Sequence, residues 1–247
     1  MHEISDKGSA DRLNVIQSRI ATALLGSGRK AQDVTLIAVS KGHSAESVRD
    51  LYRLGIRDFG ESYAGEFCKK VEETADLADI RWHFIGHLQS NKAKRVAHMR
   101  PLIHSLDRPS LLRELSKFAS PSEPLRVLVQ LQIDPDDVNK SGCNAEEAHE
   151  LCRQLAQTPG LEWEGFMGIG PASASAEKLA WLYEQFRSRA MLLWDQYSRR
   201  DPSRRTREAK LSLGMSDDLE IALRSGSNII RVGSALFGPR PDKTQAT

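Results

Sequence analysis

The sequence is poor in cysteine and has no long apolar segment, and both absences exclude classes of protein. Its 247 residues include three cysteines, Cys68, Cys143 and Cys152. Because the number is odd and the spacing fits neither a metal knuckle nor a disulfide framework, we expect free thiols in a reducing compartment. No stretch approaches the roughly 20 apolar residues of a membrane span, and the first residues lack the apolar core of a signal peptide. We therefore expect a cytoplasmic protein without a membrane partner.

An excess of charge of one sign is also lacking. The formal net charge is +2, with 28% charged and 40% hydrophobic residues, which is typical of a soluble domain with a sizeable core. This balance does not favour nucleic acid as the main partner. The basic segment 198–207 is the one stretch that favours such a partner, but a single basic loop is usually a solvated surface. We expect no nucleic-acid partner.

Two functional motifs are missing as well. No Gly-x-Gly-x-x-Gly follows the first predicted strand, which disfavours a dinucleotide-binding fold. His83 and His87 are four residues apart, a spacing that could hold zinc on a helix, but Gly86 and the preceding strand oppose a helix, and the glutamate of His-Glu-x-x-His is absent. We expect no metal. His104 fits a buried core histidine and a site residue equally well.

Apolar runs alternate with amphipathic segments along the chain. A first helix is predicted over 11–25, stopped by Gly26, with one apolar face. Strands are predicted at 34–39, 56–59, 81–85, 102–106, 125–133, 161–167, 209–213 and 228–232. Helices follow at 44–54, 62–76, 90–98, 109–118, 144–157, 175–198 and 217–225, with Ser44 as a predicted N-cap and Gly55 as a stop.

This alternation predicts an α/β fold with parallel strands and right-handed crossovers. Eight strands in a chain of this length fit a single (β/α)₈ TIM-type barrel with an extra N-terminal helix. An open, doubly wound sheet is the alternative. We expect a flexible N-terminus over 1–10, a barrel over 11–238 and a flexible tail over 239–247.

Lys41 follows the first predicted strand, and the functional residues of a barrel lie at the carboxyl ends of its strands. Desolvation at the rim of a core disfavours a charged amine, and a neutral amine can form a Schiff base with an aldehyde. The alternative is a solvated lysine in a strand-to-helix loop.

Two glycine-containing turns predict a phosphate site. Gly214, Met215 and Ser216 follow the seventh strand, and Gly233 and Ser234 follow the eighth, which is the usual phosphate position in this fold. The alternative is that the glycines form ordinary turns and that Ser216 caps a helix beginning at residue 217. The acidic pair at 217–218 favours that alternative, because it suits a helix start and repels phosphate.

The chain resembles the pyridoxal phosphate homeostasis proteins, the YggS/PROSC family. The resemblance rests on motifs in order from residue 38 to residue 238: AVSKGHSAE, LGIRDFGES, WHFIGHLQSNKAK, HSLDR, NKSGC, GFMGIG, LSLGMSDDLEIAL and GSNIIRVGSALFG. It implies a barrel like the N-terminal domain of alanine racemase. It also implies that pyridoxal 5′-phosphate (PLP) is the cofactor and that PLP-dependent apoenzymes are candidate partners. We expect a monomer rather than a dimer.

The resemblance assigns roles to individual residues. It implies a PLP Schiff base on Lys41, phosphate contacts from residues 214–216 and 233–234, and Arg231 facing the pyridine nitrogen. An arginine there keeps the ring nitrogen unprotonated, which weakens the ring as an electron sink. The family usually has Asn where this chain has Ser62, so the ring contact at Ser62 is in doubt. The family's threonine is replaced by Ser234, which keeps the hydroxyl.

Two functions from different classes remain. One is a protein that holds PLP as a lysine aldimine and takes part in intracellular PLP homeostasis without turnover, so that no residue is catalytic. The alternative is a PLP-dependent amino-acid racemase of fold type III. Such racemases take their second base, a tyrosine, from an additional β domain, and the chain ends soon after the last strand motif. Because its four tyrosines all lie on predicted helices, we favour the homeostasis protein.

Overall fold

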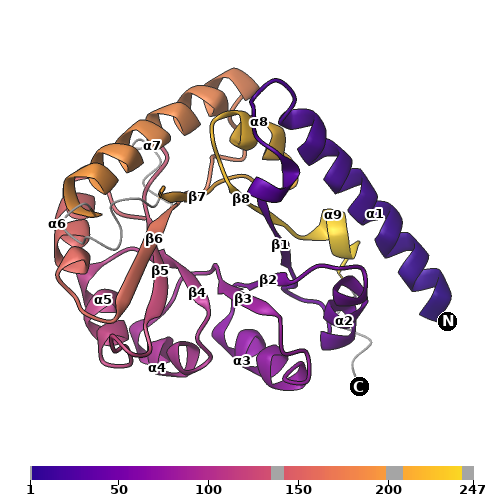
Figure 1. The fold of residues 1–247 in the computed structure, drawn as a ribbon, viewed down its shortest axis with the longest axis horizontal. Helices are drawn as coiled ribbons and strands as arrows, with labels where there is room; N and C mark the ends of the chain where they lie inside the picture. The colour runs from indigo at the N-terminus through magenta and orange to yellow at the C-terminus, as the bar shows by residue number, and fades with distance from the viewer. Residues whose placement is uncertain (1, 135–141, 199–207, 241–247) are drawn as a thin grey trace.

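Eight parallel strands close into a barrel, and helices surround it (Figure 1). The computed structural model describes residues 2–134, 142–198 and 208–240. The strands are β1 (Thr35–Val39), β2 (Asp58–Glu61), β3 (Arg81–Phe84), β4 (Leu102–Leu106), β5 (Leu125–Gln130), β6 (Leu161–Met167), β7 (Lys210–Ser212) and β8 (Ile229–Val232). Each strand pairs with the next, and β1 pairs with β8. The (β/α)₈ prediction is confirmed, and the open sheet is excluded.

Helices occur at all the predicted positions, although α1 begins nine residues earlier than predicted, and the short α9 was not predicted as a helix. They are α1 (His2–Ala23), α2 (Ala45–Arg53), α3 (Ala64–Glu73), α4 (Ser90–His98), α5 (Pro109–Ser116), α6 (Ala145–Ala156), α7 (Ala176–Tyr197), α8 (Leu219–Arg224) and α9 (Ser234–Phe237), with a short 3₁₀ turn, η1 (Ala31–Asp33), before β1. The Ser44 hydroxyl accepts the amide of Ser47, which confirms it as the N-cap of α2.

Alternation of side chains along the strands creates two apolar layers. One layer fills the barrel and contains Ile37, Val39, Leu102, Leu128, Met167 and Ile229. The larger layer lies between the strands and the helices, and its bulkiest members include Phe59, Phe84 and Trp163. This second layer fixes the ring of helices, so the strand ends and the loops after them form a rigid site.

Two helix starts differ from the predictions. Helix α1 begins at His2, so residues 2–10 are helical where the sequence indicates a flexible segment. The buried Leu13 and Ile16 anchor the helix to which these residues belong. Helix α8 begins at Leu219, and its N-cap is Asp218. The alternative interpretation, in which Ser216 caps a helix that begins at residue 217, is therefore wrong.

The N-terminal helix lies outside the ring, along α8 and α9 (Figure 1). These are the helices that follow the last two strands. The predicted tail begins at residue 239, and its first two residues are described, while 241–247 and the basic segment 199–207 lie outside the described residues. Within the described part of the chain, no helix has the length and apolar character needed to cross a membrane.

Candidate functional site

A cavity of about 290 Å³ lies at the carboxyl ends of the strands. Gly214, which was predicted to contact phosphate, does not line it, but the other predicted site residues do: Lys41, Ser62, Met215, Ser216, Arg231, Gly233 and Ser234. The cavity is also lined by Val39, His43, Ile85, Ile169, Asp217 and Arg240, which were not predicted as site residues. The fold thus brings together an amine, a guanidinium group, hydroxyls and apolar side chains from six strand ends.

The turn that carries Lys41 is held by hydrogen bonds from several directions. The amide of His43 donates to the Ser40 carbonyl over 2.9 Å, and the amide of Gly42 donates to Glu66 Oε2 over 2.9 Å. Lys70 Nζ donates to the same Ser40 carbonyl over 2.6 Å. The half-buried Lys41 therefore projects into the cavity from a fixed backbone.

A buried ion pair lies behind this turn. Lys70 of α3 contacts Glu61 of β2, and the two side chains are 5% and 0% exposed. Glu61 also accepts the Ser40 hydroxyl over 2.7 Å and the amide of Ser62 over 3.2 Å. The pair thus connects Ser40, next to Lys41, with Ser62, which follows the neighbouring strand β2. Neither Glu61 nor Lys70 was predicted as a site residue, because the pairing joins a strand end to the interior of the next helix.

The turn after β7 is shaped by a glycine and an aspartate. Gly214 has φ +88°, and a Cβ there would lie 2.5 Å from Ala222 Cβ, so only glycine fits. The amide of Met215 donates to Asp218 Oδ1 over 2.5 Å, and the Tyr183 hydroxyl donates to Asp218 Oδ2 over 2.5 Å. The Asp218 carboxylate is therefore engaged within the protein, while Met215 and Ser216 face the cavity.

The turn after β8 leads directly into α9. Gly233 is the N-cap residue, and its carbonyl accepts the amide of Leu236 over 2.8 Å. Ser234 is the first helical residue, so its amide has no acceptor within the helix. Ser216 and Ser234, which come from neighbouring turns, line the same cavity. Together they present hydroxyl and amide donors, as an anion requires.

Arg231 forms the floor of the cavity and is 4% exposed. One terminal nitrogen donates to Ser212 O and Ser212 Oγ, each over 2.6 Å, and the other donates to Gly168 O over 2.9 Å. Among the described residues, none accepts a hydrogen bond from Nε. Burial lowers the pKa of this guanidinium, but arginine remains protonated in proteins. A donor with a fixed position is therefore available to a ligand.

A chain of hydrogen bonds runs from Arg231 through the barrel interior. The Ser212 hydroxyl lies 3.0 Å from His104 Nδ1, His104 Nε2 lies 3.0 Å from His83 Nδ1, and His83 Nε2 lies 3.0 Å from Asp58 Oδ1. One assignment of protons satisfies every bond: each group donates toward Asp58, and both imidazoles are neutral. Burial lowers the pKa of His83 and, more strongly, that of His104. The open question about His104 is thus settled in favour of a buried histidine with two partners.

Two cavity residues, His43 and Arg240, were not identified from the sequence. The His43 ring stacks on Phe237 with centroids 4.9 Å apart, and burial lowers its pKa, as do the charges of Lys70 and Arg240. Arg240 lies within the segment expected to be a flexible tail, yet it lines the cavity. The position of His43 two residues after Lys41 was an available signal, whereas nothing in the sequence indicated Arg240.

His83 and His87, the two histidines whose spacing could hold zinc on a helix, differ in burial. The side chain of His87 is 54% exposed and lies 3.4 Å from Asp107 Oδ2, whereas His83 is enclosed in the barrel. The described residues contain no group of three or more His, Cys, Asp or Glu side chains that could hold a metal ion.

The three cysteines are free and buried, and burial raises the pKa of Cys143 to about 12.

Comparisons with known proteins agree with this geometry. Residues 24–241 match the alanine racemase N-terminal domain family. The pyridoxal phosphate homeostasis protein of Pseudomonas aeruginosa is 38% identical over 232 residues, which cover 94% of this chain and 95% of that protein. PipY of Synechococcus elongatus, solved with PLP bound, has 32% identity and a TM-score of 0.79 over 93% of this chain and 100% of its own.

Alanine racemase from Corynebacterium glutamicum shares the fold, with a TM-score of 0.66 at 16% identity, and the match covers 95% of this chain but 63% of the racemase. That likeness concerns the fold alone. The similarity to the homeostasis proteins extends over nearly the whole length of both sequences. This chain therefore belongs to the alanine racemase N-terminal domain family and, within it, to the pyridoxal phosphate homeostasis proteins.

Proposed function

We propose that the cavity binds PLP and that the protein takes part in intracellular PLP homeostasis. The observation that carries the proposal is the convergence of Lys41, Arg231 and the two turns at Ser216 and Ser234 on one cavity. These groups match the aldehyde, the ring nitrogen and the phosphate of PLP in chemistry and in number. The relative PipY, solved with PLP bound, supports the same ligand.

Lys41 is the residue for covalent attachment. Its amine nitrogen would bond to the aldehyde carbon of PLP, and the aldehyde oxygen would leave as water, which gives a Schiff base. When bound, PLP supplies an aldehyde that can be passed to another amine. Hydrogen bonds fix the Ser40–His43 backbone at the cavity wall, so little backbone freedom remains to be lost when Lys41 reacts.

The remaining groups orient the cofactor. Ser216 and Ser234 would donate to the phosphate, and the apolar Val39, Ile85 and Ile169 line the space for the ring. The Arg231 Nε–H would donate to the ring nitrogen. Ser62 also lines the wall, and its side chain is shorter than the family's usual asparagine, so a ring contact from this position would need a bridging water.

We propose that the protein holds and releases PLP without amino-acid turnover and that apoenzymes requiring PLP receive it. A racemase needs a second acid–base group on the opposite face of the ligand. Among the described residues that line the cavity, none is a tyrosine. Tyr183 is buried, and its proton is held by Asp218. Burial, with the charge of Asp218, raises the Tyr183 pKa, so Tyr183 is unsuited to proton transfer.

Reduction and peptide mapping test the attachment. The protein is incubated with PLP, reduced with borohydride and digested, and the pyridoxyl group is expected on Lys41. Lys41→Ala should abolish the visible absorbance of the Schiff base. Lys69→Ala is the matched control, because the Lys69 side chain lies on the outer surface and is 72% exposed. A label on another residue, or an unchanged spectrum in Lys41→Ala, contradicts the assignment.

A further inference from the structure

The N-terminal helix contacts the turn after β7 and α9, the short helix that begins at the turn after β8. Helix α1 lies along α8 and α9 (Figure 1), and two of its arginines, Arg12 and Arg19, reach them. These arginines are about two helical turns apart, so they lie on the same side of α1. Neither arginine lines the cavity. Both arginines contact backbone carbonyls, and Arg19 also pairs with the Glu220 carboxylate.

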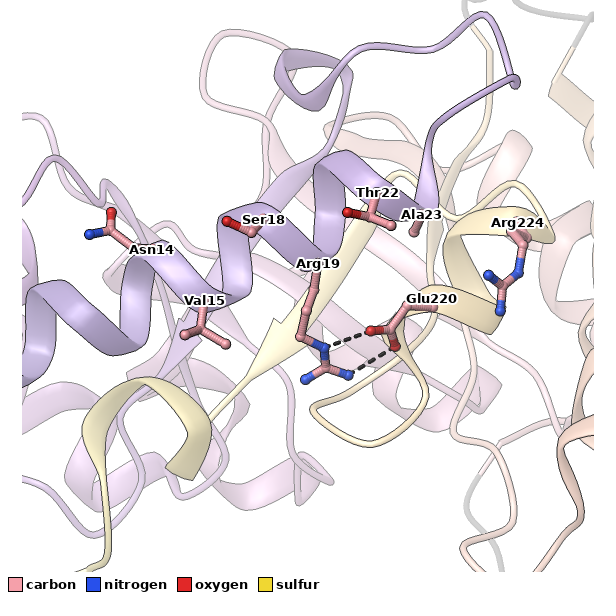
Figure 2. Close-up of a pocket in the computed structure, with 8 residues that line it drawn as sticks. All are labelled: Asn14, Val15, Ser18, Arg19, Thr22, Ala23, Glu220 and Arg224. Carbon is pink, nitrogen blue, oxygen red and sulfur yellow. Dashed lines mark hydrogen bonds and ion pairs between the residues drawn. The ribbon is translucent and has the colours of Figure 1, made fainter.

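Arg19 binds the turn after β7 and the helix that follows. Its guanidinium donates to Glu220 Oε1 over 2.6 Å and to Glu220 Oε2 over 2.9 Å, and it also donates to the Ser216 carbonyl over 2.8 Å. Figure 2 shows Arg19 extending from α1 toward Glu220 on α8, with both carboxylate contacts. The side chains of Arg19 and Glu220 are 32% and 30% exposed, so water partly screens the pair.

The contact with Ser216 determines how its peptide group is turned. The Ser216 carbonyl and the Asp217 amide belong to one trans peptide, so they point in opposite directions. Because Arg19 draws the carbonyl toward α1, the amide of Asp217 is directed away from α1. Ser216 and Asp217 both line the cavity, whereas Arg19 does not. Arg19 therefore holds an amide donor in the orientation that an anion needs.

Arg12 acts in the same way on the second turn. Its Nε donates to the Leu236 carbonyl over 2.7 Å, and a terminal nitrogen lies 3.5 Å from the Phe237 carbonyl. These carbonyls are at the carboxyl end of α9, whose amino end is the Gly233–Ser234 turn in the cavity wall. By holding one end of this short helix, Arg12 fixes the direction of the amides at the other end.

We propose that Arg12 and Arg19 are positioning residues through which α1 sets the geometry of both phosphate-binding turns. The proposal rests on the proposed PLP function and adds a role for the N-terminal helix. The arginines act through Ser216 and α9 and do not touch the ligand. Substitution of either arginine should therefore weaken the binding of a ligand that carries a phosphate and leave binding through the aldehyde unchanged.

The test compares PLP with pyridoxal, which carries the same aldehyde and lacks the phosphate. Dissociation constants for both are measured by absorbance for the wild type, Arg12→Met, Arg19→Met and Arg19→Lys. The matched control is Arg49→Met, because Arg49 makes the same kind of contacts on the outer surface: two with Asp76, at 2.7 and 2.6 Å, and one with the Glu73 carbonyl, at 2.8 Å. Urea unfolding of each variant reports stability separately.

We expect Arg12→Met and Arg19→Met each to weaken PLP binding roughly 10-fold, as is usual for residues that orient binding groups. Pyridoxal binding should be unchanged, Arg19→Lys should be intermediate, and Arg49→Met should match the wild type. The ³¹P resonance of bound PLP should also shift in Arg19→Met. An equal loss for PLP and pyridoxal, or no loss in either methionine variant, overturns this inference. If the wild type itself fails to bind PLP, the proposed function fails instead.

Discussion

Lys70→Met should strongly destabilise the protein because it leaves a buried carboxylate without its cation. Glu61 is fully buried and Lys70 is 5% exposed at the side chain. After the substitution, Glu61 keeps only the Ser40 hydroxyl at 2.7 Å and the Ser62 amide at 3.2 Å. Removal of one partner of a buried ion pair costs roughly 3–5 kcal/mol, so we expect a loss of this size in the free energy of unfolding.

The measurement is urea unfolding of the PLP-free protein, followed by circular dichroism. Lys69→Met is the control, because the Lys69–Glu73 pair is exposed, with its charged atoms 3.6 Å apart, and should contribute less than about 0.5 kcal/mol. The double variant Lys70→Met/Glu61→Gln should be more stable than Lys70→Met alone, since it removes the unpaired charge. A loss below about 1 kcal/mol in Lys70→Met, or a further loss in the double variant, would refute the reasoning.

Three further predictions concern the phosphate turns, pH and turnover. Ser216→Ala and Ser234→Ala should each cost roughly 1.5–3 kcal/mol of PLP binding free energy, measured by titration, since each removes a charge-assisted hydrogen bond; unchanged affinity in both rejects the assignment. Burial lowers the pKa of His83 and His104 in the folded protein. As the pH falls, these histidines therefore become protonated in the unfolded chain at a higher pH than in the folded protein. The free energy of unfolding should therefore stay constant above about pH 6.5 and fall below it, and urea unfolding between pH 7.5 and 5 should show this slope. PLP-loaded protein with L-alanine in deuterated water should racemise it more slowly than ~1 s⁻¹, and faster turnover favours the racemase.

The sequence predicts the elements well because each is set by local chemistry. Apolar runs, the Ser44 cap and the Gly55 stop depend on neighbouring residues, and all lie where the pattern places them. The predicted site residues meet because the carboxyl ends of all the strands of a barrel open on one side. A correct count of the strands was thus sufficient to predict that Lys41 and Ser234 lie at the same cavity.

Contacts between residues far apart in the sequence could not be predicted from such local patterns. The Glu61–Lys70 pair, the contact of Arg19 with Ser216 and the interior histidines depend on how strands and helices are rotated against one another. Periodicity gives the buried face of each element but not its partner. The start of α8 was misplaced for a related reason: Asp218 bonds to Tyr183 of the preceding helix, which no local pattern records.

The interior chain of hydrogen bonds bears directly on the choice between carrier and racemase. Arg231 donates to Ser212, and each later group donates onward until the carboxylate of Asp58 is reached. Burial would raise the Asp58 pKa, but hydrogen bonds from His83 and Arg81 lower it overall, so this end of the chain stays an acceptor. The other end is a guanidinium that keeps its proton. In the proposed orientation, the ring nitrogen of PLP would receive a hydrogen bond and no proton, so it would remain neutral. Because a neutral ring stabilises negative charge poorly, the arrangement that we propose to hold PLP would also oppose the removal of an α-proton.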